Sequence, residues 1–265
     1  MNKKRIVLTV LTAILLFVLI AISCFLFNKF ILKSKLENSF LPFAEKNENT
    51  VFSINKVTFF SSCDAKNKTA TSSNFTIENL YQYTDMAFFI NTPNSEKNLE
   101  NTFKKVYIDD IKYEQTPLLG EPKLYYKNIN NFAKSDIYEE NLVNDKLEFE
   151  ITSEDEADLN KPTLYNNLAN PIVLSYVNSN IKNDYTITDT SKPITYDGSL
   201  LKSCNVLTNN IACKFSFDVY ITNNLDQEFK TTVYVDLPLE TEEKSIYNGN
   251  VTLNQDTNFI FYRYK

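Results

Sequence analysis

The pattern of hydrophobic and polar positions sets the first residues of the chain apart from the rest. Residues 6–27 read IVLTVLTAILLFVLIAISCFLF, a run of 22 residues without a charge. As a helix rising 1.5 Å per residue, this run is about 33 Å long, enough for the roughly 30 Å hydrocarbon core of a bilayer. A helix on a soluble core keeps a polar face, and this run has none. The pattern predicts a transmembrane helix at 6–27, between a basic tail at 1–5 and a juxtamembrane linker at 28–50.

Two other interpretations of this segment fit its residues less well. A cleaved signal peptide has a shorter apolar region, of about 7–15 residues, and a small-residue cleavage site that the run does not offer. A lipoprotein signal would place the lipid on Cys24, but apolar residues 25–27 follow it where a polar tether is expected. A retained signal anchor is therefore favoured, with lipidation at Cys24 as the alternative. The basic tail and the exported character of the rest favour a cytoplasmic N-terminus and a C-terminal domain outside the cell membrane.

From Val51 onward, short runs of β-branched and aromatic residues alternate with clusters of Asn, Asp, Pro and Ser. This pattern is typical of antiparallel strands joined by turns. The clearest strands are Cys213–Thr222 and Phe229–Leu237, where apolar and polar residues alternate with a period of two. The polar loop 223–228 joins them, so we expect a hairpin. Pro238 should end its second strand, because proline cannot donate to a ladder.

Weaker patterns predict a short helical turn at 94–102 and further strands at Val51–Phe60, Asp85–Asn91, Lys104–Tyr113, Lys146–Ile151, Ile172–Val177, Ile194–Cys204 and Asn258–Tyr264. Such a succession of strands with one solvated face predicts an all-β fold, an antiparallel β-sandwich that is Ig-like or jelly-roll-like, over 51–265. One continuous domain is preferred. A boundary within the acidic stretch 153–162, which would divide it into two smaller modules, is the alternative.

Charge is distributed unevenly along the chain. Residues 1–35 carry six basic side chains and no acidic one, so the overall charge of −6 leaves −12 on residues 36–265. That region has one arginine, Arg263, and therefore lacks the basic patch that nucleic-acid binding needs. Phe (20) and Tyr (16) are abundant and spread over the predicted strands. We interpret them first as core residues.

The composition also excludes several chemistries. Without histidine, Ser-His-Asp and Cys-His hydrolysis and the HExxH zinc motif are impossible. The three glycines lie too far apart for a phosphate-binding loop, so no nucleotide is expected. Three S-x-x-K matches, at 53–56, 179–182 and 199–202, lack the accompanying SDN and KTG motifs and are interpreted as coincidence. The acidic clusters 154–158 and 109–110 match no calcium loop. We predict no catalytic, cofactor-binding or metal-binding residue.

Three cysteines follow the predicted membrane helix. Cys204 and Cys213 flank residues 205–212, which we expect to form a hairpin that brings the two thiols to face each other. Outside the cell membrane they could form a disulfide. Two buried thiols are the alternative. Cys63 has no local partner, and three cysteines at these spacings without histidine do not form a zinc signature.

These features favour a non-enzymatic module, anchored in the lipid bilayer, that binds a protein or a glycan at the cell surface. A second hypothesis is an envelope enzyme that hydrolyses glycans with two carboxylates. A third is a structural surface or matrix subunit that assembles through exposed strand edges.

Overall fold

The computed structural model describes residues 15–16, 18–20, 22–23, 26–27, 51–70, 75–92, 96–156, 158, 161–165, 170–188, 193–241 and 243–263. The chain falls into two units, residues 1–48 and residues 49–265.

In the first unit, the described residues between 15 and 27 are helical, and their large apolar side chains are 48–66% exposed. Within the described part of the chain, no helix is both long enough and apolar enough to cross a membrane. The rest of the predicted membrane helix at 6–27, the tail at 1–5, the linker at 28–50 and Cys24 lie outside the described residues.

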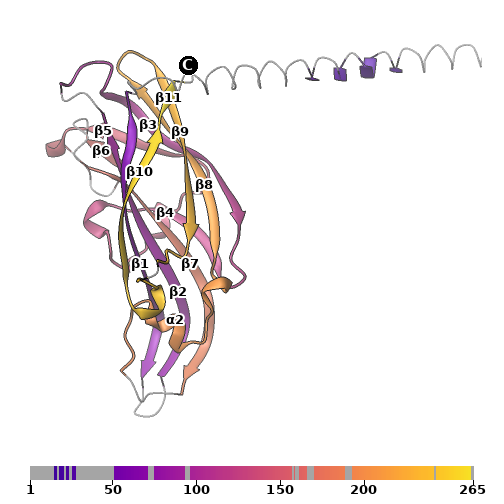
Figure 1. The fold of residues 1–265 in the computed structure, drawn as a ribbon, viewed down its shortest axis with the longest axis vertical. Coiled ribbons are helices and arrows are strands. Elements are labelled where there is room, and N and C mark those ends of the chain that lie inside the picture. The colour runs from indigo at the N-terminus through magenta and orange to yellow at the C-terminus, as the bar shows by residue number, and fades with distance from the viewer. Residues whose placement is uncertain are drawn as a thin grey trace, which may run out of the picture. The chain divides into compact units, whose positions relative to one another are not determined.

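The second unit is a β-sandwich of two sheets (Figure 1). Sheet A has the strand order β10-β1-β2-β7-β4, and sheet B has the order β11-β9-β8-β3-β5-β6. Paired strands are antiparallel except for β5 and β6, which are parallel. The strands of sheet A are β1 (Ser53–Ala70), β2 (Phe75–Asn91), β4 (Glu121–Tyr126), β7 (Ile172–Ile187) and β10 (Val251–Ile260). Those of sheet B are β3 (Phe103–Gln115), β5 (Leu147–Thr152), β6 (Thr163–Tyr165), β8 (Cys213–Asn223), β9 (Glu228–Leu237) and β11 (Tyr262–Arg263).

Short helical turns lie in the connections. They are α2 (Ser199–Ser203) and the 3-10 turns η1 (Ile129–Asn131), η2 (Glu139–Asn141), η3 (Glu154–Glu156), η4 (Thr208–Asn210) and η5 (Ile246–Asn248). Strands from before and after residues 153–162 pair in both sheets, β2 with β7 in sheet A and β3 with β8 in sheet B.

The predicted β-sandwich and the predicted hairpin between β8 and β9 are confirmed. Cys213 pairs with Leu237, and β9 ends immediately before Pro238. The apolar positions of β8 that were expected to face inward are all buried. Asp218, on the opposite face of β8, is also buried, because Lys230 and Thr232 of β9 bind its two carboxylate oxygens at 2.5 and 2.6 Å.

Two local predictions are wrong. The strand expected at Ile194–Cys204 is an irregular segment followed by α2. Leu200 and Leu201 are both fully buried, and a helical turn brings two adjacent side chains into one core, whereas strand neighbours point to opposite faces. Asp197 supports the turn by accepting a hydrogen bond from the Ser199 amide at 2.8 Å. The helical turn predicted at 94–102 is also wrong, since described residues 96–102 contain bends and no helix.

The core consists of two large clusters. The main cluster lies between the sheets, where Phe88 of β2 meets Phe217 of β8 edge-on, with ring centroids 5.5 Å apart. Tyr176 of β7 stacks on Phe215 of β8 at 5.6 Å. The smaller cluster lies at the far ends of β1, β2 and β7, beside α2 (Figure 1). These far ends carry many polar residues, which is why the sequence pattern predicted shorter strands.

Two polar rows cross the inner face of sheet A between these clusters. Strand register places one row directly next to the other, on β1, β2 and β7. The rows are Ser61, Thr84 and Tyr176, then Cys63, Gln82 and Asn178, and all six residues are buried. Ser61 and Thr84 share a hydrogen bond of 2.7 Å. The rows lie at the boundary of the two clusters, since Tyr176 belongs to the main cluster and Cys63 to the smaller one.

A buried ion pair holds the connection after β4 against the outer face of sheet A. Asp85 is 0% exposed and Lys127 is 3% exposed. The Lys127 ammonium donates to both Asp85 oxygens at 2.9 Å and to the Lys134 carbonyl at 2.5 Å. The Ser175 hydroxyl and the Ala133 amide also donate to Asp85, at 2.6 and 2.8 Å. The two charges are thus surrounded by hydrogen-bonding partners from two strands and one loop.

We call this pair and its three partners the Asp85–Lys127 clamp. Burial raises the pKa of Asp85, and the Lys127 ammonium opposes this shift. Lys127 also lies over the Tyr83 ring, 5.2 Å from its centroid. Around the clamp, Tyr81, Tyr83, Tyr125 and Val177 form a third, small cluster against which Ile137 packs. The connection between β4 and β5 therefore lies on the sheet as a fixed cover.

Replacing one member of the clamp should strongly destabilise the fold. Lys127→Met leaves the Asp85 carboxylate buried without its counter-charge. This should lower the free energy of unfolding by about 3–5 kcal/mol, which urea denaturation measures. Lys105→Met is the matched control, because Lys105 pairs with Glu148 at the surface, where such a pair contributes about 0–1 kcal/mol. Equal losses in the two variants would contradict the clamp.

Candidate functional site

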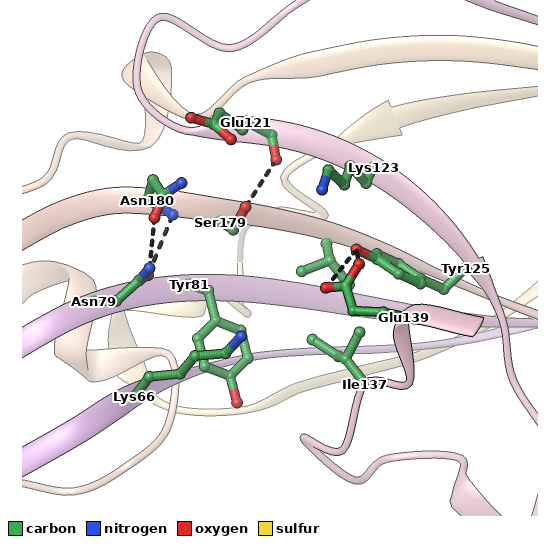
Figure 2. Close-up of a pocket in the computed structure, with 11 residues that line it drawn as sticks. Lys66, Asn79, Tyr81, Glu121, Lys123, Tyr125, Ile137, Glu139, Ser179 and Asn180 are labelled. Atoms are coloured by element: carbon green, nitrogen blue, oxygen red, sulfur yellow. Dashed lines mark hydrogen bonds between the residues drawn. The ribbon is translucent and has the colours of Figure 1, made fainter. Parts of the chain in front are cut away.

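A cavity of about 190 Å³ lies on the outer face of sheet A (Figure 2). Its floor comes from four neighbouring strands, and one wall comes from the connection between β4 and β5. The lining residues are Lys66 of β1, Asn79 and Tyr81 of β2, Glu121, Lys123 and Tyr125 of β4, Val177, Ser179 and Asn180 of β7, and Ile137 and Glu139 of the wall. We call it the sheet A pocket.

A bulge in β7 shapes the floor. Leu80 pairs with Lys182 and Gln82 pairs with Asn178, so β7 carries two extra residues at this point. Asn180, in the bulge, has φ 57°, a left-handed conformation that asparagine tolerates better than most residues. Bulges turn side chains away from their regular direction, and here the bulge brings Asn180 to the pocket.

Asn79 and Asn180 hold each other in place across two strands. The Asn79 amide nitrogen donates to the Asn180 side-chain oxygen at 2.5 Å, and the Asn180 backbone amide donates to the Asn79 side-chain oxygen at 3.3 Å. Figure 2 shows the two side chains facing each other. Beside them, the Ser179 hydroxyl donates to the Glu121 carbonyl at 3.4 Å.

Two tyrosines contribute aromatic surface and neutral hydroxyl groups. The Tyr125 hydroxyl donates to both Glu139 oxygens at 3.4 Å, and the Tyr81 hydroxyl donates to the Ser135 carbonyl at 3.3 Å. Burial, with a further contribution from the Glu139 carboxylate, raises the pKa of Tyr125 to about 12. Burial likewise raises the pKa of Tyr81. Both phenols therefore remain protonated at neutral pH.

The charged side chains of the sheet A pocket balance. Lys66 and Lys123 supply two positive charges, and Glu121 and Glu139 supply two negative ones. Among the described residues, Lys66, Lys123 and Glu121 form no salt bridge. The pocket thus offers donors and acceptors of both signs around two aromatic rings.

The predicted cysteine pair is not brought together as expected. Cys204 caps α2 and lies in the smaller cluster, whereas Cys213 begins β8 and lies in the main cluster. The hairpin expected across 205–212 is wrong, because η4 lies there and Cys213 pairs with Leu237 instead. Both thiols, and that of Cys63, are free and buried.

Of the other motifs noted in the sequence, Ser179 of the match at 179–182 lines the sheet A pocket, and the rest give no site in the described residues. The Ser199 hydroxyl donates to Asp197 at 2.5 Å, and Lys202, its partner in the S-x-x-K match, is exposed. No group of three His, Cys, Asp or Glu side chains lies where it could hold a metal ion, within the part of the chain that is described.

The sequence analysis assigned no residue of the sheet A pocket to a site, and it interpreted the one motif that includes a pocket residue, the S-x-x-K match at 179–182, as coincidence. They come from five separate segments, and most are polar residues on the outer face of a sheet, where solvated side chains are the ordinary expectation. The one local signal was the polar stretch 178–184, which directly follows the predicted strand Ile172–Val177 and contains the bulge.

The conformation of Asn180 predicts a difference between two substitutions. Asn180→Gly removes the side-chain amide, but the glycine that it introduces adopts positive φ freely. Asn180→Ala loses the amide and also strains the backbone, so it should reduce the free energy of unfolding by about 1 kcal/mol more than the glycine variant. Urea unfolding of both variants measures the difference. Equal stabilities would contradict the left-handed conformation.

Comparison of the chain with protein-family models, with curated proteins and with solved structures finds no match. The function is therefore argued from the pocket and the fold.

Proposed function

We propose that the chain is a membrane-anchored module that binds a neutral glycan in the sheet A pocket, on the outer face of the cell membrane. The observation that carries this proposal is the balanced set of two lysines, two glutamates and two asparagines around Tyr81 and Tyr125.

Sugars match this set of groups. Each hydroxyl of a sugar both donates and accepts a hydrogen bond, so carboxylates, ammonium groups and amides are all suitable partners. The Tyr81 and Tyr125 rings are 7% and 4% exposed, so they support the pocket from below and the polar groups supply the contacts to the sugar. A pocket without net charge, in a domain that carries −12, does not favour a strongly anionic ligand.

The size of the pocket favours a glycan over a protein partner. Stable protein–protein interfaces bury about 1,200–2,000 Å² of surface. A hollow of about 190 Å³ instead accommodates one or two sugar rings or a similarly small group, and small-molecule sites are concave in this way.

The transmembrane anchor and the subclass of the β-sandwich are part of the same proposal. The exposed apolar side chains between Leu15 and Phe27 would be covered by lipid in a transmembrane helix at 6–27.

We assign the sandwich to the jelly-roll-like class rather than the Ig-like class, because the chain passes between the sheets in most of its connections. It stays in one sheet only from β1 to β2, from β5 to β6 and from β8 to β9.

A carboxylate-based glycan hydrolase is the second candidate function. One observation favours it, namely that Glu121 and Glu139 line the same pocket. Glycosidases of most families use two carboxylates about 5–10 Å apart. If the protein binds an oligosaccharide and does not cleave it, the binding module is supported over the hydrolase.

Glycan binding is tested with the full-length chain in detergent and a panel of immobilised chito-, malto-, manno- and galacto-oligosaccharides. At least one should bind. Lys66→Ala and Glu139→Gln should each weaken that binding about 10-fold or more, because a hydrogen bond to a charged group contributes about 1.5–3 kcal/mol. The measurement is the dissociation constant.

Tyr234→Ala is the control for this experiment, since its ring is 64% exposed on the outer face of sheet B. It should bind as the unchanged protein does. Failure to bind any member of the panel, or equal affinity in all variants, would refute glycan binding at this pocket. Release of shorter oligosaccharides that is lost in both Glu121→Gln and Glu139→Gln would assign the hydrolase instead.

Cysteine labelling in intact cells tests the membrane orientation. Leu118 is 80% exposed, so Leu118→Cys should react with a membrane-impermeant maleimide before lysis. Asn2→Cys, in the proposed cytoplasmic tail, should react only after lysis. The background is low because Cys63, Cys204 and Cys213 are buried. The reverse labelling pattern would rule out the proposed orientation.

A further inference from the structure

Cys63 and Cys204 lie in the same small core cluster. Cys63 is on the inner face of β1, and Cys204 is the residue that caps α2, which packs against β1. Both are 0% exposed. The same cluster contains Ile77, Leu80 and Leu200.

The electrostatics of the two thiols agree with this placement. Apart from burial, the largest influence that raises the pKa of Cys63 is the charge of Cys204. This influence is in keeping with the shared cluster, because charges interact more strongly in a low-dielectric core. Cys213 belongs to the main cluster instead. Of the other described cysteines, Cys63 is therefore the one that shares a core cluster with Cys204.

We propose that Cys63 and Cys204 are joined by a disulfide in the mature protein. In this reaction two S–H bonds break and one S–S bond forms. The two electrons and two protons that are released reduce an external disulfide, such as oxidised glutathione or the disulfide of a thiol–disulfide oxidoreductase, to two thiols. The inference rests on the proposed location outside the cell membrane, where such oxidants maintain disulfides.

The position of the pair explains what the bond would stabilise. The two residues are 141 positions apart in the sequence, so the bond closes a very long loop and strongly restricts the unfolded chain. The smaller cluster is covered by α2, by Cys204, Val206 and Ile211 of the connection after it, and by η5, rather than by sheet B. A bond from Cys63 to Cys204 ties this cover to a central strand of sheet A.

Burial also determines when the bond forms. It raises the pKa of Cys63, and it raises the pKa of Cys204 to about 11, so both thiols are protonated at neutral pH in the folded domain. The thiolate is the reactive form, and an external disulfide does not reach a fully buried sulfur. We therefore expect oxidation during folding and slow oxidation once the domain has folded.

The test is refolding of the full-length, reduced chain in detergent with a mixture of reduced and oxidised glutathione. Free thiols are then blocked with N-ethylmaleimide, and the linked peptides are mapped by mass spectrometry. A peptide that joins Cys63 to Cys204, and that separates on reduction, is expected. Free Cys63 and Cys204, or a link from either to Cys24 or Cys213, would overturn the proposal.

Thermal denaturation gives a second readout. Cys63→Ser and Cys204→Ser should each lower the midpoint of oxidised protein by roughly 10 °C more than that of reduced protein. Cys213→Ser is the matched control, and its effect should be the same in both conditions. Equal effects of all three variants in both conditions would also overturn the bond. Glycan binding is measured separately, so its failure leaves these results unchanged.

Discussion

The contact between the Asp85 carboxylate and the Lys127 ammonium fixes a long connection to the outer face of sheet A. Removing two charges from water is costly, and the cost is offset here by close pairing and by donors from Ser175 and Ala133. Because residues 127–134 are held in this way, the following residues, Ile137 and Glu139, have a fixed position over the sheet. The wall of the sheet A pocket therefore depends on an ion pair that does not itself line the pocket.

Most of the strand framework could be predicted from the sequence, because strict alternation marks strands with one buried face. The segments 213–222 and 229–237 show this alternation and form the predicted hairpin. The pattern failed at Ile194–Cys204, where adjacent leucines are buried by a helical turn. It also shortened β7, since Asn178 and the bulge residues 179–181 are polar in a strand that continues to Ile187.

The pocket could not be predicted for a different reason. Its residues become neighbours only through pairing between β1, β2, β7 and β4, and a single sequence does not give that strand order. Glu121 and Glu139 illustrate the difficulty, since one begins an edge strand and the other lies in a 3-10 turn. Neither carries a local motif. The cysteines show the same limit, because Cys204 lies near Cys213 in sequence but shares a core cluster with Cys63.

The pairing of β1 has a consequence for how the domain is made. β1 is the first strand of the sandwich to leave the ribosome, and its partner β10 is nearly the last, with Ser53 opposite Ile260. Sheet A therefore cannot be completed until almost the whole chain is available. Such long-range pairing slows folding, and it leaves the edge of β1 unpaired throughout synthesis. Until β10 is made, β1 is the edge strand of sheet A, and an open edge of this length can pair with a strand of another chain.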